Sequence, residues 1–244
     1  MKLEICIDSL ESAKNAIEAE ADRLEICGSL DLDGISPSLG LVSLISKYKD
    51  IEKFVMIRPR PYDFSYSDDE FETMKEEIKE FKKYDIDGFV FGILKEDGRV
   101  DLERTRELVE LASPLRVCFH RAFDYSTDSE DLIKELIDMG IIRLLTSGKK
   151  AKAIDGIDLL RKLEEKYGED IEIMAGSGVN PDNIEIFYKK AKIKSFHMSA
   201  KEKRPSQMDY LKNNPMYQDI TYSSKAKIKE AKRAIERIEN IANI

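Results

Sequence analysis

Short segments of the chain alternate strictly between apolar and polar residues, and longer segments with helical spacing lie between them. The tetrapeptide Leu-Glu-Ile-Cys occurs at residues 3–6 and again at 24–27. In each copy the apolar side chains take one face of an extended strand, and the acid and the cysteine take the other. Between the copies, small and apolar residues recur at 13, 16, 17 and 21, close to the 3.6-residue period of a helix. The chain therefore begins with a strand, a helix and a second strand.

The same order continues to the end of the 244-residue chain. Further strands are predicted at 53–57, 88–91, 115–119, 143–146, 172–175 and 195–198. Helices are predicted over 67–83, 101–112, 127–140, 153–167, after Asn180-Pro181 and over 225–241, the last with Ile228, Ile235, Ile238 and Ile241 inward, and a loop is predicted over 200–223. Two of these helices begin at capping boxes, at 67–70 and 127–130.

Eight strands, each followed by a helix, are typical of one fold. They predict a single (βα)8 TIM-barrel domain over residues 1–244, with a parallel eight-stranded sheet. The rival is an open doubly wound sheet, which usually carries a glycine fingerprint after its first strand. Here Asp8-Ser9-Leu10 follows the first strand instead, which favours the barrel.

Composition narrows the classes of partner and compartment. The formal net charge of −8 makes a nucleic-acid partner unfavourable, because phosphate backbones are repelled. No apolar run reaches the roughly 20 residues that span a membrane, and the N-terminus lacks the apolar core of a signal peptide. The three cysteines are therefore expected to be reduced thiols of a cytoplasmic protein.

Strand parity predicts which side chains point into the barrel. The apolar set of each strand is assigned to the helix layer, so the other set lines the interior. That set comprises Glu4, Cys6, Glu25, Cys27, Met56, Arg58, Cys118, His120, Ser195, His197 and Ser199, with Arg60 just beyond. Charged residues are rarely buried unless paired, and barrel active sites lie at the C-terminal ends of the strands. We therefore predict a polar active site with Glu4, Glu25, Arg58 and His120 as catalytic candidates.

A structural ion-pair network is the alternative for this interior, with Glu4 or Glu25 held by Arg58. If the site is catalytic, Arg58 can hold a carboxylate or phosphate with two parallel hydrogen bonds. His120 can transfer protons near neutral pH if its neighbours leave its pKa there, and a partly buried glutamate can act as acid or base.

An anion subsite is predicted in the loops that follow the later strands. Glycine-rich turns let backbone N–H groups approach a phosphate, although such turns also favour Gly and Ser for conformational reasons alone. The candidate anion-binding residues are Arg60, Thr146, Ser147, Gly176, Gly178, His197 and Ser199.

Cys6 and Cys27 are the candidate metal ligands. They occupy equivalent positions of the repeated tetrapeptide on adjacent strands, about 5 Å apart in backbone spacing, where two thiolates can share a soft ion such as Cu(I). The competing interpretation is that each cysteine is a small buried hydrophobe. The spacing of cysteines and histidines fits no zinc signature.

Long motifs, in order from residue 3 to about 200, resemble the CutC copper-homeostasis family. They read EICIDS at 4–9, MIRPR at 56–60, YSDDEF at 66–71, FHRAFD at 119–124, LTSG at 145–148 and FHMSA at 196–200. One departure is Ser177, where the family tends to read glycine. The resemblance implies a cytosolic barrel protein, a homo-oligomer, with a role in intracellular Cu(I) handling. Cys6 and Cys27 are the ligands it suggests, and His120 or His197 are less favoured ones.

Two hypotheses for the function follow. The first is a copper-homeostasis protein that binds Cu(I) through cysteine thiolates. The second is an enzyme, such as an isomerase or lyase, that acts on a small phosphorylated or carboxylated metabolite at the mouth of the barrel. A binding site for a small anion would favour the second, because the Arg–His–Glu cluster is more than copper storage requires.

Overall fold

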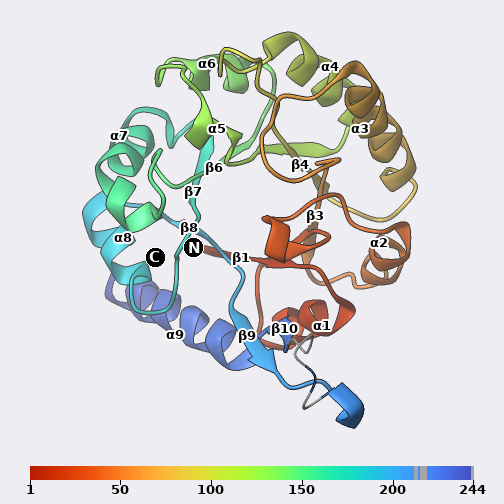
Figure 1. Ribbon diagram of the computed structural model, residues 1–244. Coiled ribbons are helices and arrows are strands. Elements are labelled where there is room, and N and C mark those ends of the chain that lie inside the picture. Colours follow the sequence, from red (N-terminus) through yellow and green to blue (C-terminus); the bar gives the residue numbers. More distant parts are fainter. Residues whose placement is uncertain (212–213, 215–218, 243–244) are drawn as a thin grey trace.

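The computed structural model describes residues 1–211, 214 and 219–242. Among these residues, eight parallel strands close into a barrel in chain order, and helices surround it (Figure 1). The strands are β1 Lys2–Ile7, β2 Arg23–Ile26, β3 Glu52–Met56, β4 Gly88–Phe91, β5 Arg116–Phe119, β6 Arg143–Thr146, β7 Glu172–Ala175 and β8 Ser195–Met198. The predicted TIM barrel is confirmed.

Helices follow the strands, and two of them, over residues 39–45 and 122–125, were not predicted from the sequence. The helices are α1 Leu10–Glu18, α2 Leu39–Ile45, α3 Asp68–Phe81, α4 Leu102–Ala112, α5 Ala122–Tyr125, α6 Leu132–Asp138, α7 Ile157–Tyr167, α8 Ile184–Ala191 and α9 Lys225–Ala242, with 3-10 turns η1 Leu30–Leu32, η2 Ala153–Gly156 and η3 Asp209–Leu211. The capping box at Ser67 and Glu70 forms in full and begins α3. Among the described helices, none is long and apolar enough to cross a bilayer.

Two predicted helix starts are wrong. The box at 127–130 does not form, because the Thr127 N–H bonds the carbonyl of Gly98 and α6 begins only at Leu132. Asn180 instead makes a local turn in which its side chain accepts from the N–H of Asp182, so α8 begins at Ile184. At both positions a hydrogen bond to another partner takes the place of the predicted helix cap.

The segment after β8 holds more structure than the predicted loop. Strands β9 Lys201–Arg204 and β10 Ile220–Ser223 pair in antiparallel fashion, outside the barrel and beside α1 and α9 (Figure 1). Helix α9 then packs between α8 and α1 and completes the ring of helices. Its predicted inward face is confirmed for Ile228, Ile235 and Ile238 and is wrong for Ile241, which is 79% exposed.

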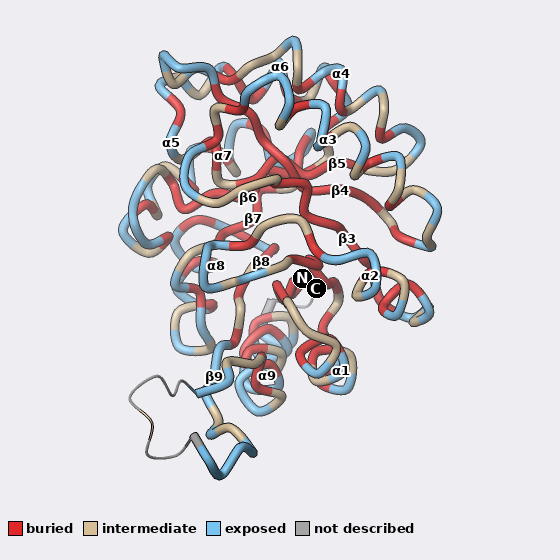
Figure 2. Tube along the Cα trace, turned by 45° about the vertical axis from the view of Figure 1, so that its right-hand side comes forward, coloured by how far each residue is buried: buried red, intermediate tan, exposed pale blue. Residues whose placement is uncertain are grey.

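Buried residues fall into two sets, one on each side of the barrel wall. Figure 2 shows that the strands are buried along most of their length, while exposed residues lie on the outer faces of the helices. The larger set fills the layer between strands and helices and includes Leu3, Ile5 and Ile7. The smaller set lies inside the barrel and comprises Cys6, Cys27, Phe54, Met56, Val90, Cys118, Leu145 and Met174. The predicted inward positions of Cys6, Cys27, Met56 and Cys118 are therefore confirmed. Phe54, Val90, Leu145 and Met174 also point inward and were not in the predicted set.

Candidate functional site

Strand register decides which interior side chains meet. Cys6 lies opposite Glu25, and Glu4 lies opposite Arg23. The two copies of the tetrapeptide are therefore offset by two residues across the β1–β2 ladder, because closing a barrel requires neighbouring strands to be staggered. The expectation that Cys6 and Cys27 face each other at equivalent positions is wrong: Cys27 lies farther along its strand, and its N–H bonds the carbonyl of Ile7.

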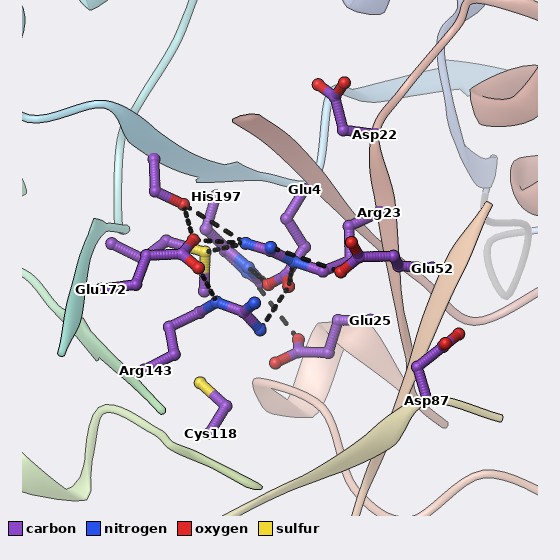
Figure 3. A network of polar contacts seen from close by, with 12 residues as sticks. Glu4, Asp22, Arg23, Glu25, Glu52, Asp87, Cys118, Arg143, Glu172 and His197 are labelled. Carbon is purple, nitrogen blue, oxygen red and sulfur yellow. Dashed lines mark hydrogen bonds and ion pairs between the residues drawn. The ribbon is translucent and has the colours of Figure 1, made fainter. Parts of the chain in front are cut away.

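A network of buried ion pairs fills the barrel below the mouth (Figure 3). The Arg23 Nε donates to Glu4 Oε2 at 2.7 Å, and its Nη2 donates to Glu172 Oε1 at 2.9 Å. The Arg143 Nε lies 2.9 Å from Glu172 Oε2, and Ser195 also donates to Glu172. Burial alone would raise the pKa of Glu4, but Arg23, His197 and Arg143 together hold it well below its usual range.

The alternative of a structural network is thus right for Glu4 and wrong for its partner. Arg23 holds Glu4, whereas Arg58 contacts neither glutamate. Sequence reasoning missed Arg23, Arg143 and Glu172, although strand parity carried the signal: Arg23 is two residues before Glu25 and so shares its inward face.

Three side chains with metal-ligand atoms converge above this network. The Cys6 sulfur, a Glu25 carboxylate oxygen and a His197 ring nitrogen all lie within 4.8 Å of one another. His197 Nδ1 is 2.7 Å from Glu4 Oε1, and its Nε2 is 3.8 Å from Glu25 Oε2. Because the ionised Glu4 accepts from Nδ1–H, the Nε2 nitrogen is the one turned toward Cys6 and Glu25. A carboxylate that orients a histidine in this way is the usual support of a metal ligand.

The charges of this cluster are shared between its members. Burial raises the pKa of Glu25, an effect that nearby His197 partly offsets. Burial alone would lower the pKa of His197, but Cys6, Glu25 and Glu4 outweigh it and raise that pKa well above its ordinary value. Glu25 Oε1 is buried and has no hydrogen-bond partner within the described chain. The cluster therefore has both a proton that a cation can displace and a carboxylate oxygen free to bind one.

The other two cysteines are less accessible. Cys27 is fully buried, and its thiol donates to Glu25 Oε2 at 3.4 Å. Burial and the neighbouring Glu25 raise its pKa well above the ordinary value, so the thiol keeps its proton. Cys118 is also fully buried, and burial raises its pKa. Both belong to the apolar interior, and neither lines the pocket at the C-terminal ends of the strands.

A pocket of about 310 Å³ opens at the C-terminal ends of the strands. Cys6, Glu25 and His197 line it together with four further predicted residues, Arg58, His120, Gly178 and Ser199. Other lining side chains are Arg121 and the aromatic residues Tyr62, Phe64 and Tyr125. The structure thus brings most of the predicted site residues to one cavity at the end of the barrel where active sites lie.

Arg58 lines the pocket, but its guanidinium is already occupied. It donates to the backbone carbonyls of Leu32, Asp33, Gly34 and Tyr62. These bonds tie the loops after β2 and β3 together, so bidentate binding of an anion would have to replace them. Arg60 does not line the pocket, because Glu70, Asp63 and backbone carbonyls hold it outside.

His120 is held as a neutral imidazole in this structure. Its Nδ1 accepts from the N–H of Ala122 at 3.2 Å, which places the proton of the neutral ring on Nε2. Burial and the positive charges of Arg58 and Arg121 lower its pKa to about 3. The ring is therefore neutral across the physiological range, unlike the proton carrier that the sequence predicted.

The predicted anion donors after β6 are occupied by a carboxylate of the protein itself. Asp124 accepts from the hydroxyl of Thr146, from the N–H and hydroxyl of Ser147 and from the N–H of Lys149. Thr146 and Ser147 consequently do not line the pocket. Gly176 does not line it either; a side chain there would collide with Leu145, which explains the glycine.

Comparison with known proteins identifies the family. The sequence model of the CutC family matches residues 1–202. The chain belongs to the CutC family. A CutC family protein from Vibrio vulnificus is 42% identical over 212 residues, which cover 86% of this chain and 85% of that protein. The copper homeostasis protein cutC homolog of Homo sapiens is 41% identical over 208 residues, which cover 85% of this chain and 76% of that protein.

Solved structures agree with this assignment. A crystal structure of CutC from Streptococcus agalactiae superposes with a TM-score of 0.78 at 30% identity, covering 82% of this chain and 98% of that one. Phosphoribosylanthranilate isomerase from Pyrococcus furiosus gives a TM-score of 0.59 at 15% identity, covering 97% of this chain and 99% of that one. At that identity the second match shows a shared barrel fold alone.

Proposed function

We propose that this CutC family protein serves copper homeostasis by binding a copper ion at the base of the barrel pocket, through Cys6 and His197 with Glu25 beside them. The observation that carries the proposal is the convergence of these three side chains within 4.8 Å. Relatives named as copper homeostasis proteins support the choice of copper as the ion.

The donor set suits the ion. A thiolate selects soft cations such as Cu(I), and imidazole is a common copper ligand. Glu4 supports the site from below by fixing His197 through Nδ1, so Nε2 is left for the metal. Copper would be the cargo of this site, and a reducing cytoplasm, where thiols stay available, is the compartment that fits it.

Binding would release protons, because a metal ligand must be deprotonated. The positively charged His197 gives up the Nε2 proton, and Cys6 binds the ion as a thiolate. Affinity should therefore rise with pH. Cys27 is a weaker candidate than the sequence suggested, since its thiol would have to release a proton held by burial and turn away from Glu25.

The test is anaerobic titration of Cu(I) against a chromogenic chelator that competes with the protein. The wild type is expected to bind one ion per chain. Glu4→Gln should weaken binding by about 10–100-fold, as for other supporting partners of metal ligands, and Cys6→Ser should weaken it more. Cys118→Ser is the matched control, because that thiol is buried in the same barrel but does not line the pocket.

Two results would count against this assignment. In the first, Cys6→Ser binds Cu(I) as tightly as the wild type. In the second, Cys118→Ser loses as much affinity as Cys6→Ser. Cys27→Ser separates the two ligand sets: a small loss supports the cysteine–histidine site, and a loss equal to that of Cys6→Ser supports the two-thiolate site predicted from sequence.

A further inference from the structure

The wall of the pocket contributed by β5 has its own chemistry, which copper binding does not use. We propose that Arg121 and His120 form a second subsite that binds the oxyanion of a small organic acid, whose remaining atoms lie in the same cavity as Cys6, Glu25 and His197. This inference goes beyond the proposed copper function and does not depend on it.

Arg121 is held in place by the acidic side chain that fills the turn after β6. Its Nε donates to Asp124 Oδ2 at 2.9 Å, and its Nη2 lies 3.3 Å from Ser147 Oγ. Asp124 is in turn held by Thr146, Ser147 and Lys149, so it cannot follow the arginine into the pocket. The third nitrogen, Nη1, has no hydrogen-bond partner in the described part of the chain, and the side chain lines the cavity while 30% exposed. The guanidinium is therefore oriented at one edge and available at the other.

His120 supplies a neutral donor next to this cation. The Ala122 N–H fixes its tautomer, so the ring carries its proton on Nε2. That nitrogen is buried and lacks a partner within the described residues, although the ring lines the pocket and is only 3% exposed. A buried donor without an acceptor is unfavourable, and native proteins rarely keep one without a reason. A ligand oxygen that accepts from Nε2–H would remove the penalty.

The other cations of the pocket already have partners. His197 lies between Glu4 and Glu25. Arg58 donates to four backbone carbonyls, as described above. The Lys201 Nζ donates to the carbonyl of Leu30 and lies 3.2 Å from Asp31. Arg58 still contributes its positive field at His120. Arg121 is thus the cation best placed to pair with an incoming anion, and Arg58 supports it from a distance.

The cavity limits the size and kind of acid. Its volume of about 310 Å³ lies at the lower end of the roughly 300–1,000 Å³ range of ligand pockets, which suits a small metabolite. The rim is aromatic, with the rings of Phe64 and Tyr125 only 5.5 Å apart. Leu145, Val179 and Met198 add apolar surface. An acid with a short carbon body, as carboxylate or phosphate ester, fits a cavity of this size that has charged side chains on its walls and aromatic and apolar side chains beside them.

The test is isothermal titration of the metal-free, full-length protein with malonate and, separately, with inorganic phosphate. The wild type is expected to bind at least one of them. Arg121→Gln should weaken that binding by about tenfold or more, the loss of one charge-assisted hydrogen bond, and Arg121→Lys should weaken it less. Arg161→Gln is the matched control, because Arg161 is a half-exposed arginine on α7 that does not line the pocket.

A second variant tests the subsite independently, in case the Arg121 variant does not fold. His120→Phe keeps a ring at that position and leaves the Arg121–Asp124 ion pair in place, and it should weaken binding several-fold through loss of the Nε2 donor. Tighter binding of phosphate than of malonate would assign the subsite to phosphate esters, and the reverse would assign it to carboxylates. The inference is overturned if the wild type binds neither probe, or if the Arg121 and His120 variants bind as the wild type does. Because this titration uses metal-free protein, its result is independent of copper binding. A protein that binds malonate but not copper would therefore contradict only the proposed copper function.

Discussion

Replacing Arg23 by methionine tests whether the ion pairs inside the barrel are needed for stability. Arg23 is 1% exposed and makes charge-assisted hydrogen bonds to Glu4 at 2.7 Å and to Glu172 at 2.9 Å. Breaking one side of a buried pair typically costs about 3–5 kcal/mol, because the partner charge stays buried. Glu4 keeps His197, and Glu172 keeps Arg143, so the change should not abolish folding. We expect Arg23→Met to lower the free energy of unfolding by about 3–5 kcal/mol at neutral pH.

The pH dependence of this loss is the sharper part of the prediction. The pKa of Glu4 is lowered in the folded protein, so its contribution to stability is present above the ordinary value of 4.5 and is lost as pH falls through the lowered value. Without Arg23, the pKa of Glu4 and of Glu172 should rise. In the variant these carboxylates then become protonated at a higher pH than in the wild type, which removes their unpaired buried charge. The difference in free energy of unfolding between the two proteins should therefore shrink in acid.

Urea unfolding followed by circular dichroism at about pH 7 and about pH 4 measures both effects. Arg161→Met is the control, because exposed ion pairs on α7 contribute no more than about 1 kcal/mol. A loss below about 1 kcal/mol for Arg23→Met would refute the reasoning. So would a loss that is the same at both pH values, since the cost would then come from packing rather than from unpaired carboxylates.

Two further predictions concern packing and the histidines. Gly88→Ala would place a Cβ 2.3 Å from the carbonyl oxygen of Arg116, and we expect it to destabilise the protein by about 1–3 kcal/mol in the same urea assay. At Gly40 a Cβ meets nothing within 4 Å, so Gly40→Ala should stabilise the protein by about 0.4–1 kcal/mol. Equal effects of the two substitutions would contradict the close packing at Gly88. By NMR, neither imidazole should titrate near pH 6.5, because the pKa of His120 is lowered to about 3 and that of His197 is raised well above 6.5. Because His120 stays neutral in the folded protein, it lowers the free energy of unfolding as pH falls below 6.5. His197 instead adds stability that is present below pH 6.5 and is lost as pH rises through its raised pKa. A titration midpoint near 6.5 for either ring would contradict the environment described for that histidine.

The order of elements was readable because each strand and helix carries its own periodicity. Burial of one face is enough to separate Leu3 and Ile5 from Glu4 and Cys6, and it gave the correct inward set of β1. Local capping rules failed where the residue had a competing hydrogen-bond partner that is close in space. The box at Thr127 looks as complete as that at Ser67, yet the Thr127 N–H bonds Gly98, about thirty residues away in the chain.

For the site residues, too, local periodicity predicted the position, but contacts with distant residues decided the role. Parity brought Cys6, Glu25, Arg58, His120 and His197 to one cavity, as predicted. What each of them does there depended on contacts that residue type does not reveal. The guanidinium of Arg58 is occupied by loop carbonyls and His120 is fixed as a neutral donor.

By itself, the sequence determined the number of barrel strands, the inward faces of several of them and the end of the barrel at which polar side chains gather, because these depend on local periodicity and on the hydrophobic effect. Only the tertiary structure decided the partners. The stagger of the closed barrel sets Cys6 against Glu25 rather than Cys27, and Glu4 against Arg23. Charge pairing and proton positions follow from distances between strands, and those distances are fixed only when the barrel closes.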